Sequence, residues 1–243
     1  TTEVDEITKV TLTATIKVNN MVETIDFEVI ILPYGVESIL VKTNITDAHK
    51  LDLDTKIRIY GIVVATMYLD YRHYYLIKDN TGLIYVKLPD GSSIYNSQIG
   101  LLFDIIGYID ENEGQSYLRA EKITNDGVAY TDVTFTEMTL ANITNLSIYD
   151  HLSIGLPVEL TGWIVNDNYI TDGYNTFKLT CSYFDEYSIT KYNGYKVTIK
   201  AFYYGYNDGE IVLVFSNSNS TSYSSTIEMT YHTETEMINK GIE

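Results

Sequence analysis

The 243-residue sequence has little cysteine, proline, tryptophan or arginine. Its one cysteine, Cys181, excludes an intramolecular disulfide and a metal cluster built from cysteines. No apolar run approaches the roughly 20 residues that a membrane-spanning helix needs. The first residues, Thr1-Thr2-Glu3, lack the basic and apolar segments of a signal peptide. We therefore expect no membrane-spanning segment.

Basic charge is also scarce, with 16 Lys and Arg against 33 Asp and Glu and a formal net charge of −17. Tight binding to duplex DNA or anionic lipid depends on a basic surface that attracts phosphates. The charge therefore argues against a duplex DNA partner. With 45% hydrophobic and 20% charged residues, the chain has enough apolar side chains to form folded domains.

Strand-forming residues are abundant. The sequence contains 23 Tyr and many Ile, Thr and Val, arranged in short runs of two-residue alternation. β-branched and aromatic side chains fit a pleated, half-buried surface. This chemistry predicts an all-β protein.

Residues 1–33 contain the first alternating pattern. Apolar residues alternate with Thr and Lys from Val10 to Val18, and a second alternating run covers Ile25 to Ile31. Asn19-Asn20 between them suits a turn, and Pro33 ends the second run. The pattern predicts an N-terminal β-hairpin.

Residues 46–125 predict five strands. A short helical turn from Thr46 to His49 precedes a long first strand, in which Gly61 marks a bend. A hairpin with the turn Asn80-Thr81-Gly82 and two further strands follow. Five strands with a curved first strand are typical of a small barrel.

Residues 132–217 follow the same order more loosely, with Gly162 at the bend of their first strand. The sequence therefore predicts two tandem five-stranded barrels after the hairpin. The remaining residues, 218–243, begin with a Ser- and Asn-rich stretch that is typical of a polar linker and end in a C-terminal tail.

Residues 46–125 also resemble a known fold. The segment from Tyr74 to Val86, which includes the turn Asp79-Asn80-Thr81-Gly82, resembles strands 2 and 3 of oligonucleotide/oligosaccharide-binding (OB) folds. Together with the opening Ile59 to Val64, it is similar to OB domains of secreted or cell-surface bacterial proteins, including some extracellular nucleases. The hairpin resembles the closing strands of a bacterial immunoglobulin-like domain. These resemblances imply an extracellular or cell-surface location.

Catalytic motifs are missing from the sequence. His49, His73, His151 and His232 have no metal-ligand spacing, and no Gly-x-Ser-x-Gly, phosphate-binding Gly-Lys-Ser/Thr or His-Glu-x-x-His motif is present. Cys181 lies in an alternating run, which favours a buried small hydrophobe over a reactive thiol. The chain is therefore predicted not to be an enzyme and to use no cofactor or metal.

Two acidic loops, at residues 110–114 and 166–173, are rich in the oxygen ligands that a hard cation prefers. Neither fits the twelve-residue calcium loop. Asp, Asn and Gly are also the residues that form tight turns, so the composition favours two turns over two metal sites.

The placement of positive charge indicates where a ligand would bind. The only arginines, Arg58, Arg72 and Arg119, all lie in the first predicted barrel. If Tyr75 and Ile77 point into that barrel, strand alternation places six neighbouring residues together on the opposite face. These candidate ligand-binding residues are Arg72, Tyr74, Leu76, Lys78, Tyr85 and Lys87.

Aromatic rings beside cations can stack on the bases of single-stranded nucleic acid or on sugar rings. The alternative is that Tyr serves only as a good strand residue. The sequence as a whole predicts a non-catalytic binding or spacer region of a secreted or surface protein, with single-stranded nucleic acid or oligosaccharide as ligand. The second interpretation is a set of accessory, substrate-presenting domains of an extracellular nuclease.

Overall fold

The computed structural model describes residues 8–18, 21–31, 40, 42–92, 98–113, 115–129, 131, 133–146, 153–180 and 189–215. The chain divides into two compact units, residues 1–40 and residues 41–243, and each is considered by itself. Within the described ranges, no helix is long and apolar enough to cross a membrane. The predicted linker and tail at 218–243 lie outside these ranges.

The first unit contains the predicted hairpin. Strands β1 (Thr8–Val18) and β2 (Met21–Ile31) pair antiparallel in one unbroken register, from Thr8 opposite Ile31 to Val18 opposite Met21. The turn predicted at Asn19-Asn20 lies outside the described residues. The hairpin is confirmed, whereas its resemblance to an immunoglobulin-like domain stays a prediction.

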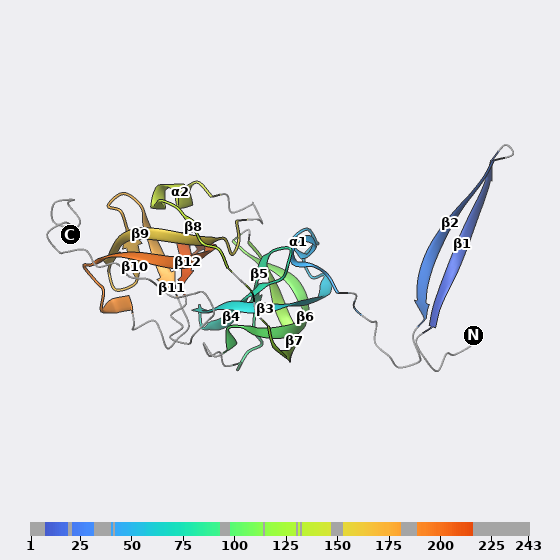
Figure 1. Ribbon diagram of the computed structural model, residues 1–243, viewed down its shortest axis with the longest axis horizontal. Coiled ribbons are helices and arrows are strands. Elements are labelled where there is room, and N and C mark those ends of the chain that lie inside the picture. Colours follow the sequence, from blue (N-terminus) through green and yellow to red (C-terminus); the bar gives the residue numbers. More distant parts are fainter. Residues whose placement is uncertain are drawn as a thin grey trace. The chain divides into compact units, whose positions relative to one another are not determined.

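The second unit begins with a closed five-stranded barrel, which we call barrel 1 (Figure 1). Its strands are joined in the order β3-β4-β5-β7-β6, with β3 and β6 paired to close the ring. The elements are α1 (Ile45–Ala48), β3 (Lys56–Leu69), β4 (Arg72–Lys78), β5 (Leu83–Lys87), β6 (Leu101–Asn112) and β7 (Gln115–Val128). The predicted short helical turn and five strands are confirmed.

Barrel 2 follows, with the elements β8 (Thr136–Glu137), α2 (Leu140–Thr144), β9 (Pro157–Val165), β10 (Tyr169–Thr171), β11 (Thr176–Thr180), β12 (Lys196–Asn207) and β13 (Glu210–Phe215). The pairings β9–β10, β10–β11, β11–β13, β13–β12 and β12–β9 form a ring. This is the strand order of barrel 1, and in both barrels the third and fifth strands run parallel. The fold is therefore two tandem OB-fold-like barrels with an N-terminal hairpin, as predicted.

The repeat extends to details that the alternation of residues did not show. In barrel 1, Lys42 makes a parallel bridge to Arg58 just before α1, and in barrel 2 the short strand β8 pairs parallel with β9 just before α2. Helix α2 begins with a capping box, in which the side chains of Thr139 and Asn142 each accept from the other's backbone N–H. Both β8 and α2 are absent from the sequence prediction.

Each barrel has its own apolar core. The core of barrel 1 includes Ile59, Ile77 and Val86, and that of barrel 2 includes Leu160 and Leu213. A third apolar cluster joins residues of both barrels. The two barrels are therefore packed against each other through an apolar contact, and this contact decides what the candidate site can do.

Candidate functional site

The strands of the predicted binding face alternate as expected. Tyr75, Ile77, Ile84 and Val86 all lie in the core of barrel 1. Their neighbours on β4 and β5 therefore point outward, because successive side chains of a strand point to opposite faces. In OB folds the outward face of strands 2 and 3 is the ligand-binding face, and in barrel 1 these strands are β4 and β5.

Three of the six predicted ligand-binding residues are nevertheless covered. Tyr74, Leu76 and Tyr85 are 7%, 1% and 1% exposed. They belong to the apolar cluster that barrel 1 shares with barrel 2, in which barrel 2 contributes Ile154, Phe202, Tyr204, Val212 and Val214. The prediction of an exposed aromatic platform is thus corrected, because the second barrel takes the place that a ligand would need.

The buried tyrosines pack edge to face. The ring centroids of Tyr74 and Tyr117 are 6.2 Å apart, those of Tyr74 and Tyr204 6.4 Å, and those of Tyr85 and Tyr204 5.0 Å, with interplanar angles of 68–78°. Such pairs add to the energy of burial. Burial raises the pKa of Tyr74 to about 12, since the phenolate would lose its water. These tyrosine rings therefore form part of the apolar core that the two barrels share.

Polar contacts fix how the two barrels meet. Gln115 at the start of β7 donates from Nε2 to the carbonyl of Tyr206 at 2.8 Å, and the carboxylate of Glu113 accepts from the backbone N–H of Asp208 at 2.8 Å. Gly205, with φ of +112°, lies directly against Gln115, and a Cβ there would be 2.4 Å from its Oε1. The turn between β12 and β13 is thus hydrogen-bonded to the turn between β6 and β7, and the corresponding loop of OB folds takes part in ligand binding.

The three cationic members of the predicted set are not buried, but they do not converge. Arg72 is ion-paired with Asp90 at 3.0 Å. Lys87 lies over the ring of Tyr117, 5.8 Å from its centroid. Lys78 donates from Nζ to the neighbouring carbonyl of Asp79 at 3.5 Å. Ligand binding by these three residues stays a prediction.

A row of four residues crosses the outside of barrel 1, and sequence reasoning had placed only Lys87 among them in the ligand-binding set. Lys56 lies opposite Tyr108, Tyr108 opposite Arg119, and Arg119 opposite Lys87. We call these four residues the cation–tyrosine stripe. Lys56 and Arg119 both lie over the ring of Tyr108, at 5.3 and 5.2 Å from its centroid. The residues come from four strands, so only the register between strands could have revealed the row.

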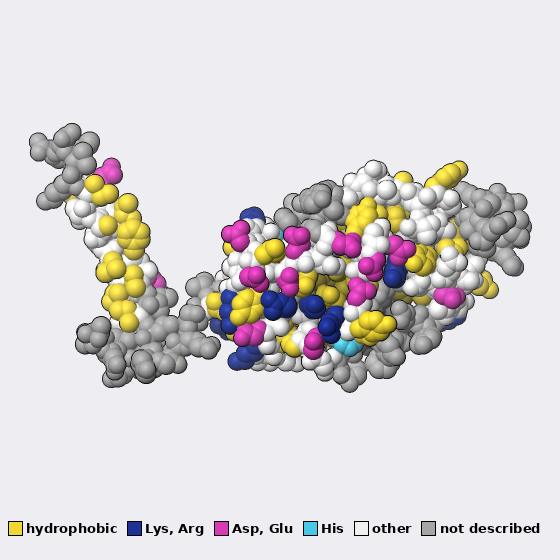
Figure 2. All heavy atoms as spheres, turned by 180° about the vertical axis from the view of Figure 1, so that it is seen from behind, with side chains coloured by type: hydrophobic (Ala, Val, Ile, Leu, Met, Phe, Trp, Pro, Cys, Tyr) yellow, Lys and Arg dark blue, Asp and Glu magenta, His cyan; other side chains and the backbone are white. Residues whose placement is uncertain are grey.

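Acidic groups neutralise most of this stripe. Lys56 pairs with Glu121 at 2.6 Å, and Arg119 pairs with Asp110 at 3.0 Å and with Asp54 at 3.6 Å. On the face shown in Figure 2, basic side chains form a row with acidic side chains on both sides. All three arginines of the chain are ion-paired: Arg58 with Asp104, Arg72 with Asp90 and Arg119 with Asp110. This surface therefore offers little net positive potential to a phosphate backbone.

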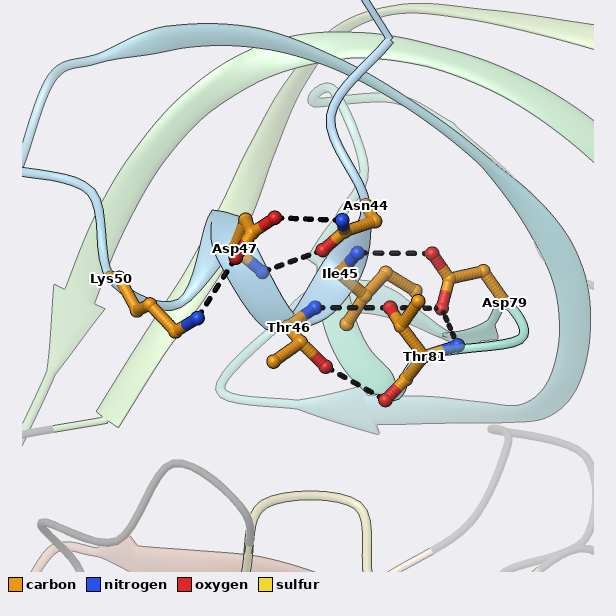
Figure 3. A network of polar contacts seen from close by, with 7 residues as sticks. All are labelled: Asn44, Ile45, Thr46, Asp47, Lys50, Asp79 and Thr81. Atoms are coloured by element: carbon orange, nitrogen blue, oxygen red, sulfur yellow. Dashed lines mark hydrogen bonds and ion pairs between the residues drawn. The ribbon is translucent and has the colours of Figure 1, made fainter.

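The turn between β4 and β5 joins the strands to helix α1 (Figure 3). The Asp79 carboxylate accepts from the backbone N–H groups of Ile45, Thr81 and Gly82 at 3.0, 2.6 and 2.9 Å. The hydroxyl of Thr46 donates to the carbonyl of Thr81 at 2.7 Å. The Asp-x-Thr-Gly turn, which supported the OB resemblance, is therefore a structural clamp in this protein.

Barrel 2 achieves the same link with different residues. The hydroxyl of Thr144, at the end of α2, donates to the side chain of Asn175 at 3.0 Å, and the Asp172 carboxylate accepts from the backbone N–H groups of Tyr174 and Asn175. The acidic loop around Asp172 is a hydrogen-bonded turn. Across the described ranges, no group of three or more His, Cys, Asp or Glu side chains is placed to hold a metal ion.

The outward face of β10 and β11 occupies the position in barrel 2 that the covered face has in barrel 1. Tyr169 and Lys178 are directly opposite each other there and are partly exposed. The hydroxyl of Tyr169 donates to the carboxylate of Glu210 at 3.2 Å. Trp163 and Thr171, the next residues on this face, are buried. On its described residues, this face of barrel 2 therefore offers one partly exposed tyrosine beside one lysine.

The two histidines within the described ranges serve the fold. His49 is buried, with Nε2 2.8 Å from the carbonyl oxygen of Leu83 and Nδ1 2.9 Å from the hydroxyl of Ser116. Burial lowers the pKa of His73, whose ring packs on Tyr68. The other predicted positions, His151, Cys181 and His232, lie outside the described residues.

Comparison with family models and with curated proteins finds no match. Among solved structures, asparaginyl-tRNA synthetase from Pyrococcus horikoshii is 17% identical over 37% of this chain and 23% of the synthetase, with a TM-score of 0.30. The hypothetical protein ygiW from E. coli is 20% identical over 36% of this chain and 90% of its own, with a TM-score of 0.29. Fission yeast Pot1, solved with single-stranded DNA, is 9% identical over 93% and 95% of the two chains, with a TM-score of 0.33.

The matched part thus spans less than a quarter of the synthetase. Similarities at this level carry no argument about function. The class of this protein follows from its own strand order, which is that of a tandem pair of OB-fold-like barrels.

Proposed function

We propose that residues 42–215 form a rigid, non-catalytic spacer region of a secreted or surface-attached bacterial protein. The location rests on the resemblance of the sequence to surface proteins. Of the two roles that the sequence left open, binding and spacing, the proposal favours spacing. A tandem pair of barrels that cannot bend at its junction would keep the segments on either side at a fixed separation.

One observation carries this proposal, which is that the β4–β5 face of barrel 1 is built into the contact with barrel 2. Leu76 and Tyr85 are 1% exposed there, and Phe202 on the facing surface is also 1% exposed. Apolar burial opposes relative motion of the barrels, and the hydrogen bonds of Gln115 and Glu113 to barrel 2 favour one arrangement. A ligand could reach the face only by separating the two barrels.

The charge on the outer surface supports spacing over nucleic-acid binding. Single-stranded nucleic acid binds by releasing counterions from phosphates that meet cations, and the basic groups of the cation–tyrosine stripe are mostly paired with carboxylates. A neutral oligosaccharide does not need free cations. Any ligand of the stripe is therefore expected to be a sugar chain.

The test is a fluorescence-anisotropy titration of labelled single-stranded oligonucleotides at low and moderate salt, followed by the same titration with a labelled neutral polysaccharide. We expect no saturable binding of the oligonucleotide. Saturable, salt-sensitive binding that Arg72→Ala weakens would contradict the proposal and favour the nuclease-accessory interpretation. Saturable binding of polysaccharide that is insensitive to salt would replace the spacer role by a glycan-binding role.

A non-catalytic role is part of the same proposal. The matching assay incubates the purified chain with single-stranded DNA, RNA and polysaccharide in the presence of Mg²⁺, Ca²⁺ or Mn²⁺. No turnover is expected. Turnover that persists through repeated purification would overturn this part.

A further inference from the structure

The hairpin of β1 and β2 has one apolar and one mostly polar face. Residues that lie directly opposite each other in an antiparallel pair share a face. The pairs Val10–Val29, Leu12–Phe27 and Ala14–Ile25 therefore form three successive apolar rows, and Ile16 and Ile31 extend the face at its two ends. Figure 2 shows hydrophobic side chains running along the hairpin.

The opposite face is suited to water. Lys9 and Glu28 form an ion pair at 2.7 Å, and the hydroxyl of Thr13 donates to Asp26 at 2.5 Å. The apolar face is not suited to water, because its side chains Leu12, Ile25 and Phe27 are 56%, 51% and 53% exposed. A two-stranded hairpin that leaves this much apolar surface in water is at best marginally stable.

The described part of residues 41–215 holds no second surface of this kind. Its large apolar side chains lie mainly in the three internal clusters. The exposed ones lie in turns and loops or, for Val128, at the end of β7, and these residues are Leu51, Leu53, Tyr71, Val128, Tyr174 and Tyr195. The apolar face of the hairpin therefore needs a partner surface that is itself apolar and of similar size.

We propose that this cover is the hairpin of a second copy of the chain, so that two hairpins pack face to face into a four-stranded, two-layer sandwich. A two-fold axis across the strands would bring the Leu12–Phe27 row of one copy over the Ala14–Ile25 row of the other. The largest row then meets the row that contains the smallest side chain. Glu23 is the one ionisable residue in these rows and the rows beside them. It lies opposite Ile16, in the row next to Ala14–Ile25, near the end of the face.

The area of the apolar face limits the affinity of this dimer. Eleven residues per strand give a face roughly 37 Å long and about 10 Å wide, and two such faces bury on the order of 1,000 Å² in total. This area is at the lower end for a specific interface. The dimer is thus expected to be reversible, with dissociation in the micromolar range.

The experiment is sedimentation of the full 243-residue chain from low micromolar to sub-millimolar concentration. The expected weight-average mass rises from 27.6 kDa toward twice that value. Leu12→Thr and Ile25→Thr should each raise the dissociation constant by about tenfold or more. Threonine is used because it keeps the strand propensity that a charged residue would endanger.

The matched control is Val22→Thr, which removes an equally exposed side chain, at 57%, from the opposite face. It should leave the dissociation constant unchanged. A chain that stays monomeric at every concentration overturns the proposal and favours a facing sheet from another sequence, such as the rest of an immunoglobulin-like sandwich. A dimer that survives Leu12→Thr and Ile25→Thr also overturns it, because another surface would then hold the copies together.

Discussion

Asp79 connects the turn between β4 and β5 to the first residue of helix α1 through its carboxylate. Burial opposes ionisation of its carboxyl group, but hydrogen bonds from Thr81, Ile45 and Gly82 outweigh burial and hold its pKa below the ordinary range. The ionised form is therefore favoured by folding. The stability it contributes is present above the ordinary pKa and is lost as the pH falls through the lowered value.

We expect Asp79→Ala to lower the free energy of unfolding by about 2 kcal/mol at neutral pH, because several backbone N–H groups lose their acceptor. Urea unfolding at pH 7 and near pH 3 measures the effect, and the gap between wild type and variant should narrow in acid. The neighbouring substitution Asn80→Ala serves as the control. A gap that is the same at both pH values would contradict this role of the carboxylate.

Gly61 and Gly162 occupy equivalent places in the first strands of the two barrels. A Cβ on Gly61 would lie 2.6 Å from Cγ2 of Ile77 and 2.7 Å from the carbonyl oxygen of Lys78. A Cβ on Gly162 would lie 2.7 Å from Cγ1 of Ile170. The close approach of the next strand therefore requires glycine at both places.

Gly61→Ala and Gly162→Ala are each expected to destabilise the protein by about 1–3 kcal/mol, because the added methyl group overpacks the barrel wall. Thermal unfolding of the two single variants measures the cost. If either variant unfolds at the wild-type temperature, the neighbouring strand can accommodate a methyl group at that position and glycine is not required there.

At the scale of elements, the pair β4–β5 works as an interface with barrel 2. Leu76→Ala should therefore cost about 2–5 kcal/mol, as for a buried leucine in a core. Lys87→Ala, on the strand beside it, should change stability by less than about 0.5 kcal/mol. Chemical denaturation distinguishes the two. A small effect of Leu76→Ala would mean that the face is free and open to a ligand after all.

The tyrosines of this interface make the pairing of the barrels sensitive to alkali. Burial raises the pKa of Tyr74 to about 12, above the ordinary value of about 10. A raised pKa of a phenol gives stability that is complete below pH ~10 and is lost as the pH rises toward about 12.

The denaturant midpoint should accordingly fall between pH ~10 and ~12, and Tyr74→Phe should reduce that fall, because phenylalanine cannot ionise. The midpoint measured at several alkaline pH values gives the answer. A wild-type midpoint that is constant over this range would show that these phenols ionise without separating the barrels.

At the scale of the whole molecule, the two barrels differ in the outer surface of their fourth and fifth strands. The outer surface of β12 and β13 is apolar, with Phe202 and Val212 buried against barrel 1. The strands at the same place in barrel 1, β6 and β7, carry Tyr108, Arg119 and Glu121 instead. Packing of the kind that joins barrel 2 to barrel 1 would therefore bury charges at these strands of barrel 1, so only barrel 2 uses this surface as an apolar contact.

The two barrels should also tumble as one body. Amide ¹⁵N relaxation of residues 42–129 and of residues 133–215 is expected to give a single rotational correlation time, because the apolar interface allows no hinge between them. Tyr85 and Phe202, each 1% exposed, lie within that interface. Two different correlation times would contradict the rigid spacer.

Local alternation determined most of the fold. The period of two in Tyr74 to Val86 assigned Tyr75 and Ile77 to the core and Tyr74 and Leu76 to the outside, because each strand sorts its own side chains. The bends predicted at Gly61 and Gly162 stay a prediction, while the structure shows that the next strand approaches both glycines closely. The sequence did not predict the short elements β8 and α2, because two to five residues are too few to show an apolar periodicity. The spacing of Thr139 and Asn142 was nevertheless a usable capping signal for α2.

Only the tertiary structure decided what the outward face of β4 and β5 meets. Leu76 and Tyr85 are covered by Phe202 and Val212, which are more than a hundred residues away in the chain. Alternation tells outside from inside within one sheet, but an outward apolar or aromatic side chain looks the same whether a ligand or a second barrel will cover it. The sequence by itself therefore determined two barrels and a hairpin, and long-range packing turned the expected binding face into a joint.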